Sequence, residues 1–211
     1  MNQPPPTTLK KIQTLAQITA DLRKGKDYSI TRLTVLKSLC ADPEAAVQFA
    51  LHIAKLTRKK MANRSRPGPA KPTKSGLYKK IVVDAVRGMT GYMKRRSTKT
   101  EEALYELLSQ AKDAQNEYDR QQWGPVRIIH SMDLLVVETA LECVLRPLDS
   151  SAFGYLLARR YAERYNPRFG TGLLPESAPM MEEIVAFWGR YYLGSAWKKK
   201  LQISASPDLK V

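Results

Sequence analysis

The chain has 211 residues, of which 43% are hydrophobic and 26% are charged. This balance can support a folded core and excludes a wholly disordered chain. Lys and Arg number 35 against 20 Asp and Glu, so the formal net charge is +15 and the isoelectric point is about 9.9. The longest apolar run, residues 152–158, is too short for a bilayer span, which needs roughly 18 residues.

The opening residues, MNQPPPTTLKK, lack the apolar stretch of a secretory signal. Cys40 and Cys143 each lie in apolar-rich helical sequence. This setting favours buried free thiols in a reducing compartment, although a disulfide between the two is the open alternative. We therefore expect an intracellular, soluble protein of the cytoplasm.

The first part of the chain predicts three helices. Residues 9–22 carry apolar side chains at helical spacing, and a second helix begins near Ser29. Asp42 then stands as N-cap with Pro43 at the first helical position, an arrangement that satisfies free helix amides and suits the fixed proline φ. The third helix runs to about residue 61.

A Pro-rich, basic stretch separates these helices from the rest of the chain. Residues 63–75, NRSRPGPAKPTKS, contain no apolar period and predict a linker or arm. Residues 77–96 then predict a strongly amphipathic helix, with an apolar side and a basic side. Thr98 and Glu101 form a capping box for the next helix.

The remaining sequence predicts three further helices, over residues 126–145, from Asp149 or Ser150, and over residues 179–200. No alternating strand pattern or fixed repeat is present in the sequence. The predicted fold is therefore all-α, a helical bundle of about eight helices in two parts joined by a basic Pro-rich linker. The predicted organisation is an N-terminal three-helix segment at 1–62, the linker at 63–75, a C-terminal helical domain at 76–202 and a tail at 203–211.

The positive charge is concentrated in one fifth of the chain. Between Lys55 and Lys99 there are fifteen Lys or Arg residues and one acid, Asp84, so this segment carries +14. The rest of the chain carries +1. A charge excess that served solubility alone would be spread out, so its concentration favours an anionic partner.

No recognised arrangement of catalytic or metal-binding residues accompanies this charge. The two histidines and two cysteines lie at 40, 52, 130 and 143, without the short paired spacing of zinc sites. His130 and Asp133 are three residues apart, but no Ser or Cys nucleophile motif is near them. The loop RFGTGLLPES matches no phosphate-loop pattern. We therefore expect no cofactor, no metal and a non-enzymatic protein.

The sequence also argues against reading of duplex DNA by a helix-turn-helix. That motif contacts bases through the first residues of its second helix, which here read DPEAAVQFAL, acidic and then apolar. A second basic cluster, ARRYAERYNPRF, interleaves arginines with aromatic residues and could hold phosphates and stack on bases. The residues predicted to bind nucleic acid are Lys55, Arg58, Lys59, Lys60, Arg64, Arg66, Lys71, Lys74, Lys79, Lys80, Arg87, Lys94, Arg95, Arg96, Arg160, Arg164 and Arg168.

Four interpretations of residues 55–99 remain open. The first is binding of a nucleic acid, most consistently RNA, through its phosphates. The second is an acidic protein surface, which would make the protein an assembly factor or adaptor. The third is an anionic membrane surface. The fourth is internal neutralisation by the acidic helix that begins at Thr98. The first is our prediction and the second is its alternative.

Overall fold

The computed structural model describes residues 6–63, 74–120, 125–163 and 172–202. Every regular element in these ranges is a helix, which confirms the predicted all-α class. The single β-type contact among them is an isolated antiparallel bridge between Tyr28 and Leu173. None of the helices described combines the length and the apolar character that a bilayer span requires.

The elements follow the predicted order, but the predicted second helix, from near Ser29, is divided into a short 3-10 turn over 30–34 and a short α-helix over 35–39. In chain order they are α1 (Pro6–Arg23), η1 (Ile30–Thr34), α2 (Val35–Leu39), α3 (Pro43–Asn63), α4 (Lys74–Lys94), α5 (Thr98–Arg120), α6 (Pro125–Leu145), η2 (Pro147–Asp149), α7 (Ser150–Glu163), η3 (Pro175–Ser177), α8 (Ala178–Leu193) and α9 (Trp197–Gln202).

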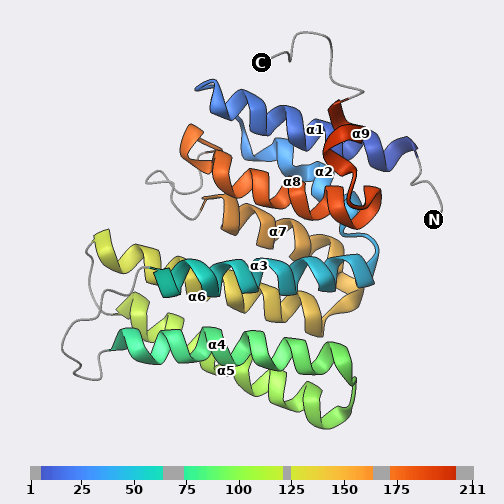
Figure 1. The fold of residues 1–211 in the computed structure, drawn as a ribbon. Helices are drawn as coiled ribbons and strands as arrows, with labels where there is room; N and C mark the ends of the chain where they lie inside the picture. Colours follow the sequence, from blue (N-terminus) through green and yellow to red (C-terminus); the bar gives the residue numbers. More distant parts are fainter. Residues whose placement is uncertain (1–5, 64–73, 121–124, 164–171, 203–211) are drawn as a thin grey trace.

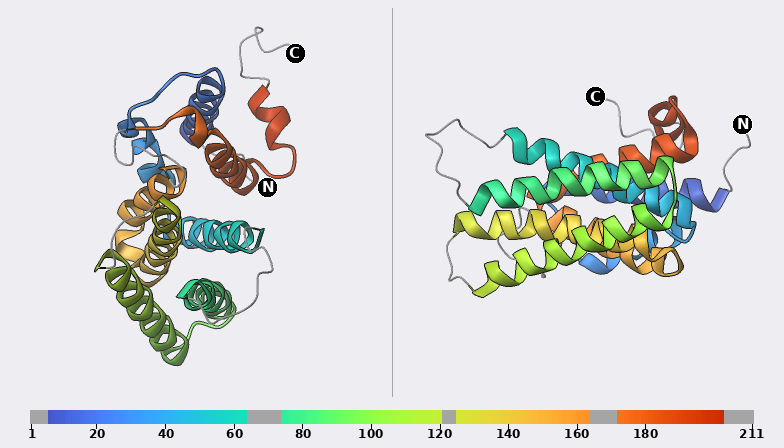
Figure 2. Two further views of the ribbon diagram at one scale, coloured as in Figure 1. Left: turned by 90° about the vertical axis from the view of Figure 1, so that its left-hand side faces the viewer. Right: turned by 90° about the horizontal axis from the view of Figure 1, so that it is seen from below.

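Helix α3 lies in the middle of the molecule. It packs against α4 on one side, α6 and α7 on another, and approaches α8 on a third (Figures 1 and 2). Helices α4, α5 and α6 pack against one another, and α1 packs against α8. One continuous apolar cluster contains buried residues from α1 through α9. The division of the chain into two parts at 63–75 stays a prediction.

Two helix starts show how local sequence sets the boundaries. The Asp42 Oδ1 accepts a hydrogen bond from the amide of Glu44 at 3.0 Å, which confirms Asp42 as the cap of α3. At α5 the cap lies one residue earlier than predicted. The Ser97 hydroxyl accepts from the Thr100 amide at 3.3 Å, and the Thr100 hydroxyl accepts from the Ser97 amide at 3.0 Å. A reciprocal Ser–Thr pair thus replaces the predicted Thr–Glu box.

The predicted single helix over residues 179–200 is wrong, because the chain turns at Gly194. This glycine has φ of +74°, a left-handed conformation that ends α8. Helix α9 then folds back so that Trp197 lies against Gly189, where a Cβ atom would come within 2.5 Å of the indole. The absence of a side chain at Gly189 therefore allows α9 to pack on α8.

The two cysteines are buried free thiols, as predicted. Burial raises the pKa of Cys143 to about 12, so its thiol stays protonated. Cys40 lies so close to α7 that a Cβ atom on Gly154 would be 2.4 Å from its Sγ. The glycine therefore sets the spacing between α2 and α7, which are in direct contact.

Candidate functional site

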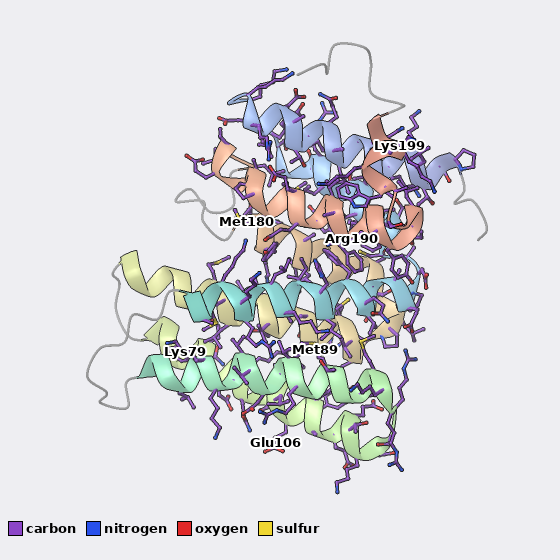
Figure 3. The ribbon with its side chains drawn as sticks, viewed as in Figure 1. Lys79, Met89, Glu106, Met180, Arg190 and Lys199 are labelled. Carbon is purple, nitrogen blue, oxygen red and sulfur yellow. The ribbon has the colours of Figure 1, made fainter. Side chains whose placement is uncertain are left out.

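The amphipathic pattern of α4 decides which of its side chains reach solvent. The apolar side is buried, with Val82, Ala85 and Met89 each at most 1% exposed. Figure 3 shows Met89 in the layer between α3 and α4. Arg87 and Lys94 are exposed on the other side of the helix. Because the apolar side is part of the core, it is not available to enter a lipid surface.

The outer side of α4 meets α3 along a groove of about 480 Å³. Four of its eight lining residues are cations, two from each helix, and none is acidic. The antiparallel course of α3 and α4 brings together residues about thirty positions apart in the sequence (Figure 1). The lining residues are Lys55, Arg58, Val83, Val86, Arg87, Thr90, Gly91 and Lys94.

Helical spacing arranges the four cations as two short rows. Arg87 and Lys94 are seven residues apart, or about 10 Å along α4, and Lys55 and Arg58 are about 4.5 Å apart along α3. Between the α4 cations, Gly91 presents no side chain, and a Cβ built on it would meet nothing within 4 Å. The groove therefore stays open between its charges.

The charges of the groove are largely unpaired among the residues that the structure describes. Arg87 approaches Asp84 of its own helix at 3.5 Å, but its side chain is 80% exposed, so this pair is worth little. Lys55, Arg58 and Lys94 form no ion pair with any residue that the structure describes. Four like charges around one hollow repel one another, and an anion in the groove would relieve that repulsion.

Three further predicted residues lie near the groove cations in the sequence. Lys59 follows Arg58 on α3, Lys80 lies two turns before Arg87 on α4, and Arg95 follows the last groove cation. All three side chains are exposed and form no ion pair within the described ranges. Lys79, beside Lys80, is half-buried instead.

Other predicted residues are engaged inside the fold. Lys60 donates a hydrogen bond to Glu183 of α8 at 2.8 Å. Arg96 donates to Glu44 at the start of α3 at 2.7 Å, so it joins the end of α4 to α3. These contacts separate both residues from the groove, although they belong to the same basic segment of the sequence.

The Arg160 side chain is also engaged inside the fold, in contact with α6. Its guanidinium donates to the Thr139 hydroxyl and to the Leu135 carbonyl oxygen, both on α6. Burial lowers the pKa of Arg160, and the carboxylates of Glu138 and Glu142 partly compensate. This side chain therefore links α7 to α6.

Six predicted residues lie outside the described side chains, together with most of the linker, the tail and the beginning of the RFGTGLLPES loop. They are Arg64, Arg66, Lys71, Lys74, Arg164 and Arg168. His130 of the His130–Asp133 pair lies outside them as well, whereas Asp133 is described and buried.

The acidic helix α5 packs against α4 but does not line the groove. Its Leu104 and Leu107 contact the face of α4 that carries Gly88. Glu106 accepts a hydrogen bond from Gln110 of the same helix and lies on the outer side of α5, away from α3 (Figure 3). Lys112 of α5 pairs with Glu142 of α6 at 2.9 Å.

Sequence reasoning missed the uncharged part of the groove. Val83 is 36% exposed beside Arg87, and the Thr90 hydroxyl donates to the Val86 carbonyl oxygen at 2.7 Å, so these residues shape the floor. The available signal was the spacing of Lys80, Arg87 and Lys94 by seven, which places these cations on one stripe of α4. Val83 and Thr90 are also seven residues apart and lie beside that stripe.

No group of three or more His, Cys, Asp or Glu residues in the described ranges could hold a metal ion. The groove presents fixed positive charge, donor groups and exposed apolar contacts, a combination that suits an anion. In comparisons with known proteins, the chain matches no family model, no curated protein and no solved structure at a significant level.

Proposed function

We propose that the protein binds RNA through the groove between α3 and α4, as a binding protein and not as an enzyme. The observation that carries this proposal is the convergence of Lys55, Arg58, Arg87 and Lys94 on one groove that no carboxylate lines. Phosphate contacts of this kind release counterions from the nucleic acid, which supplies affinity without sequence reading. Lys59, Lys80 and Arg95 supply further contacts on the same segment.

The packing of α3 favours a single strand over duplex DNA. Ala45, Ala46 and Val47, in the first turns of α3, are each at most 4% exposed. A helix that enters the major groove needs its first turns free to reach base edges. An unpaired strand can instead lie along a shallow basic groove and adapt to it.

An acidic protein is the second candidate partner. It is favoured by the exposure of Leu77 and Val83, at 50% and 36%, on the same helix as the groove cations. An amphipathic acidic helix could place apolar side chains on these residues and carboxylates on the lysines and arginines. The protein would then act as an assembly factor or adaptor. The cytoplasmic location stays a prediction.

Fluorescence anisotropy with labelled oligo(U) of about 12 nucleotides tests the RNA proposal. With four phosphate contacts, affinity should fall about 50-fold between about 50 and 200 mM salt, since each single-strand contact contributes about 0.7 to the logarithmic slope. Changing Lys55, Arg58, Arg87 and Lys94 together to Gln should weaken binding at least tenfold and flatten this slope.

A matched control separates the groove from net charge. Lys10, Lys24, Arg32 and Lys199 are exposed and lie outside the groove. Their joint change to Gln removes the same charge and should leave most of the affinity. Equal loss in both quadruple variants would contradict a groove site.

Purification from the host with and without nuclease then separates the two candidate partners. A stoichiometric protein partner that survives nuclease would support the second candidate, an acidic protein.

A further inference from the structure

A second hollow lies on a different side of α3 from the basic groove. It is bounded by α1, α3, α8 and α9, and its volume is about 670 Å³, inside the range of roughly 300–1,000 Å³ typical of small-molecule sites. Figures 1 and 2 show α8 on one side of α3 and α4 on the other. His52 and Leu56 line this cavity, whereas Lys55 and Arg58 line the groove.

Most of the cavity wall is apolar. Ala16 and Ala20 of α1 and Val185 and Ala186 of α8 line it. Trp197 of α9 completes the wall, held against α8 by the contact with Gly189 described above. Small side chains on two helices and an indole on a third leave room for a flat apolar body.

The carboxylates at the cavity already have partners. Glu182 accepts from Arg23, and Glu183 accepts from Lys60 and from the Tyr161 hydroxyl.

Two further cations, Arg190 and Lys198, line the cavity. Neither forms an ion pair with a residue that the structure describes. Figure 3 shows Arg190 on the side of α8 that faces α3. The cavity therefore carries a positive charge excess beside an apolar wall.

His52 also lines the cavity. Its Nε2 is buried and has no hydrogen-bond partner in the described structure, while its ring packs on Phe187 with centroids 5.1 Å apart. Burial, followed by the positive charge of Arg190, lowers the pKa of His52 to about 4, so the imidazole is neutral at pH 7. Because it is neutral, the His52 ring lines the cavity without adding to its positive charge.

We propose that this cavity binds a small organic anion with a flat apolar body. Its acidic group is held by Arg190 and Lys198, and its body packs on Trp197 and the alanines. This site is independent of the RNA-binding groove. A carboxylate and a phosphate monoester share the required chemistry.

Isothermal titration calorimetry of the full chain tests the proposal with three probes that share one ring system: naphthalene-2-carboxylate, 2-naphthyl phosphate and the neutral naphthalene-2-methanol. At least one anion should bind ten or more times as tightly as the alcohol. The stronger of the two anions identifies the head group. Joint change of Arg190 and Lys198 to Gln should abolish the advantage of the anion over the alcohol.

The double change Lys24→Gln and Lys199→Gln serves as the control. Both side chains are exposed and lie outside the cavity, and the two substitutions remove the same charge as the Arg190/Lys198 variant. A second variant, Ala20→Leu, fills the cavity without changing charge and should weaken all three probes. Circular dichroism establishes that each variant is folded. Absence of anion binding, equal binding of the alcohol, or an unchanged anion affinity in the Arg190/Lys198 variant would each overturn the proposal.

Discussion

The ammonium group of Lys60 and the hydroxyl of Tyr161 both donate to the same carboxylate oxygen of Glu183. One acid on α8 thus joins α3 and α7. The Lys60 ammonium also lies 5.2 Å from the centre of the Tyr161 ring. A lysine from the most basic stretch of the sequence therefore acts in the packing of three helices.

Lys60→Gln should lower the free energy of unfolding by about 1–2 kcal/mol, because it leaves Glu183 with a poorer partner in a half-buried setting. The neighbouring change Lys59→Gln removes the same charge from an exposed side chain and should alter stability by less than about 0.5 kcal/mol. Urea denaturation of the two variants makes the comparison. Equal effects would show that the contact with Glu183 contributes nothing.

Gly154→Ala should destabilise the fold by about 1–3 kcal/mol, because the new Cβ would lie 2.4 Å from Cys40 Sγ in a buried contact between α2 and α7. Gly91→Ala is the matched change on an open helix surface, where the added Cβ would meet no atom of a neighbouring element within 4 Å. It should raise stability by up to about 1 kcal/mol through helix propensity. Thermal unfolding of both variants checks the opposite signs.

Gly91→Glu should strongly weaken oligo(U) binding, because it places a carboxylate between Arg87 and Lys94 without removing any cation. Gly91→Ala at the same position should retain binding, which separates charge from bulk. Anisotropy titrations of the two variants measure this difference. If the Glu variant bound as well as the wild type, the groove would not be the site of contact.

The unfolding free energy should fall as the pH is lowered from about 6.5 toward 4. The folded protein holds the pKa of His52 near 4, below its ordinary value of 6.5, because of burial and then Arg190 and Lys55, against the opposing effect of Glu183. The unfolded chain therefore binds the proton more readily, and stability present above pH 6.5 is lost on acidification.

At pH 5 the loss attributable to His52 is about 1.5 kcal/mol, after allowance for the partial exposure of the ring. His52→Leu should lose correspondingly less stability than the wild type between pH 7.5 and pH 5. Urea denaturation at the two pH values provides the measurement. An identical loss in both proteins would mean that protonation of His52 is not coupled to unfolding.

Local chemistry made most helices predictable. Asp42 and Pro43 determine the start of α3, because cap and fixed φ act within one turn. The break at Gly194 was harder to predict, since a glycine within a long apolar period can either remain helical or turn left-handed. Packing of Trp197 on Gly189 distinguishes these outcomes, and that contact depends on tertiary structure.

The sequence by itself determined the all-helical class and the concentration of positive charge between residues 55 and 99, because periodicity and charge are properties of neighbouring residues. Only the tertiary structure decided which cations face outward together. Lys55 and Arg87 meet in one groove, whereas Lys60 and Arg160 are drawn to partners on α8 and α6. The physical reason is that ion pairs and grooves form between helices whose relative positions depend on the packing of the whole core.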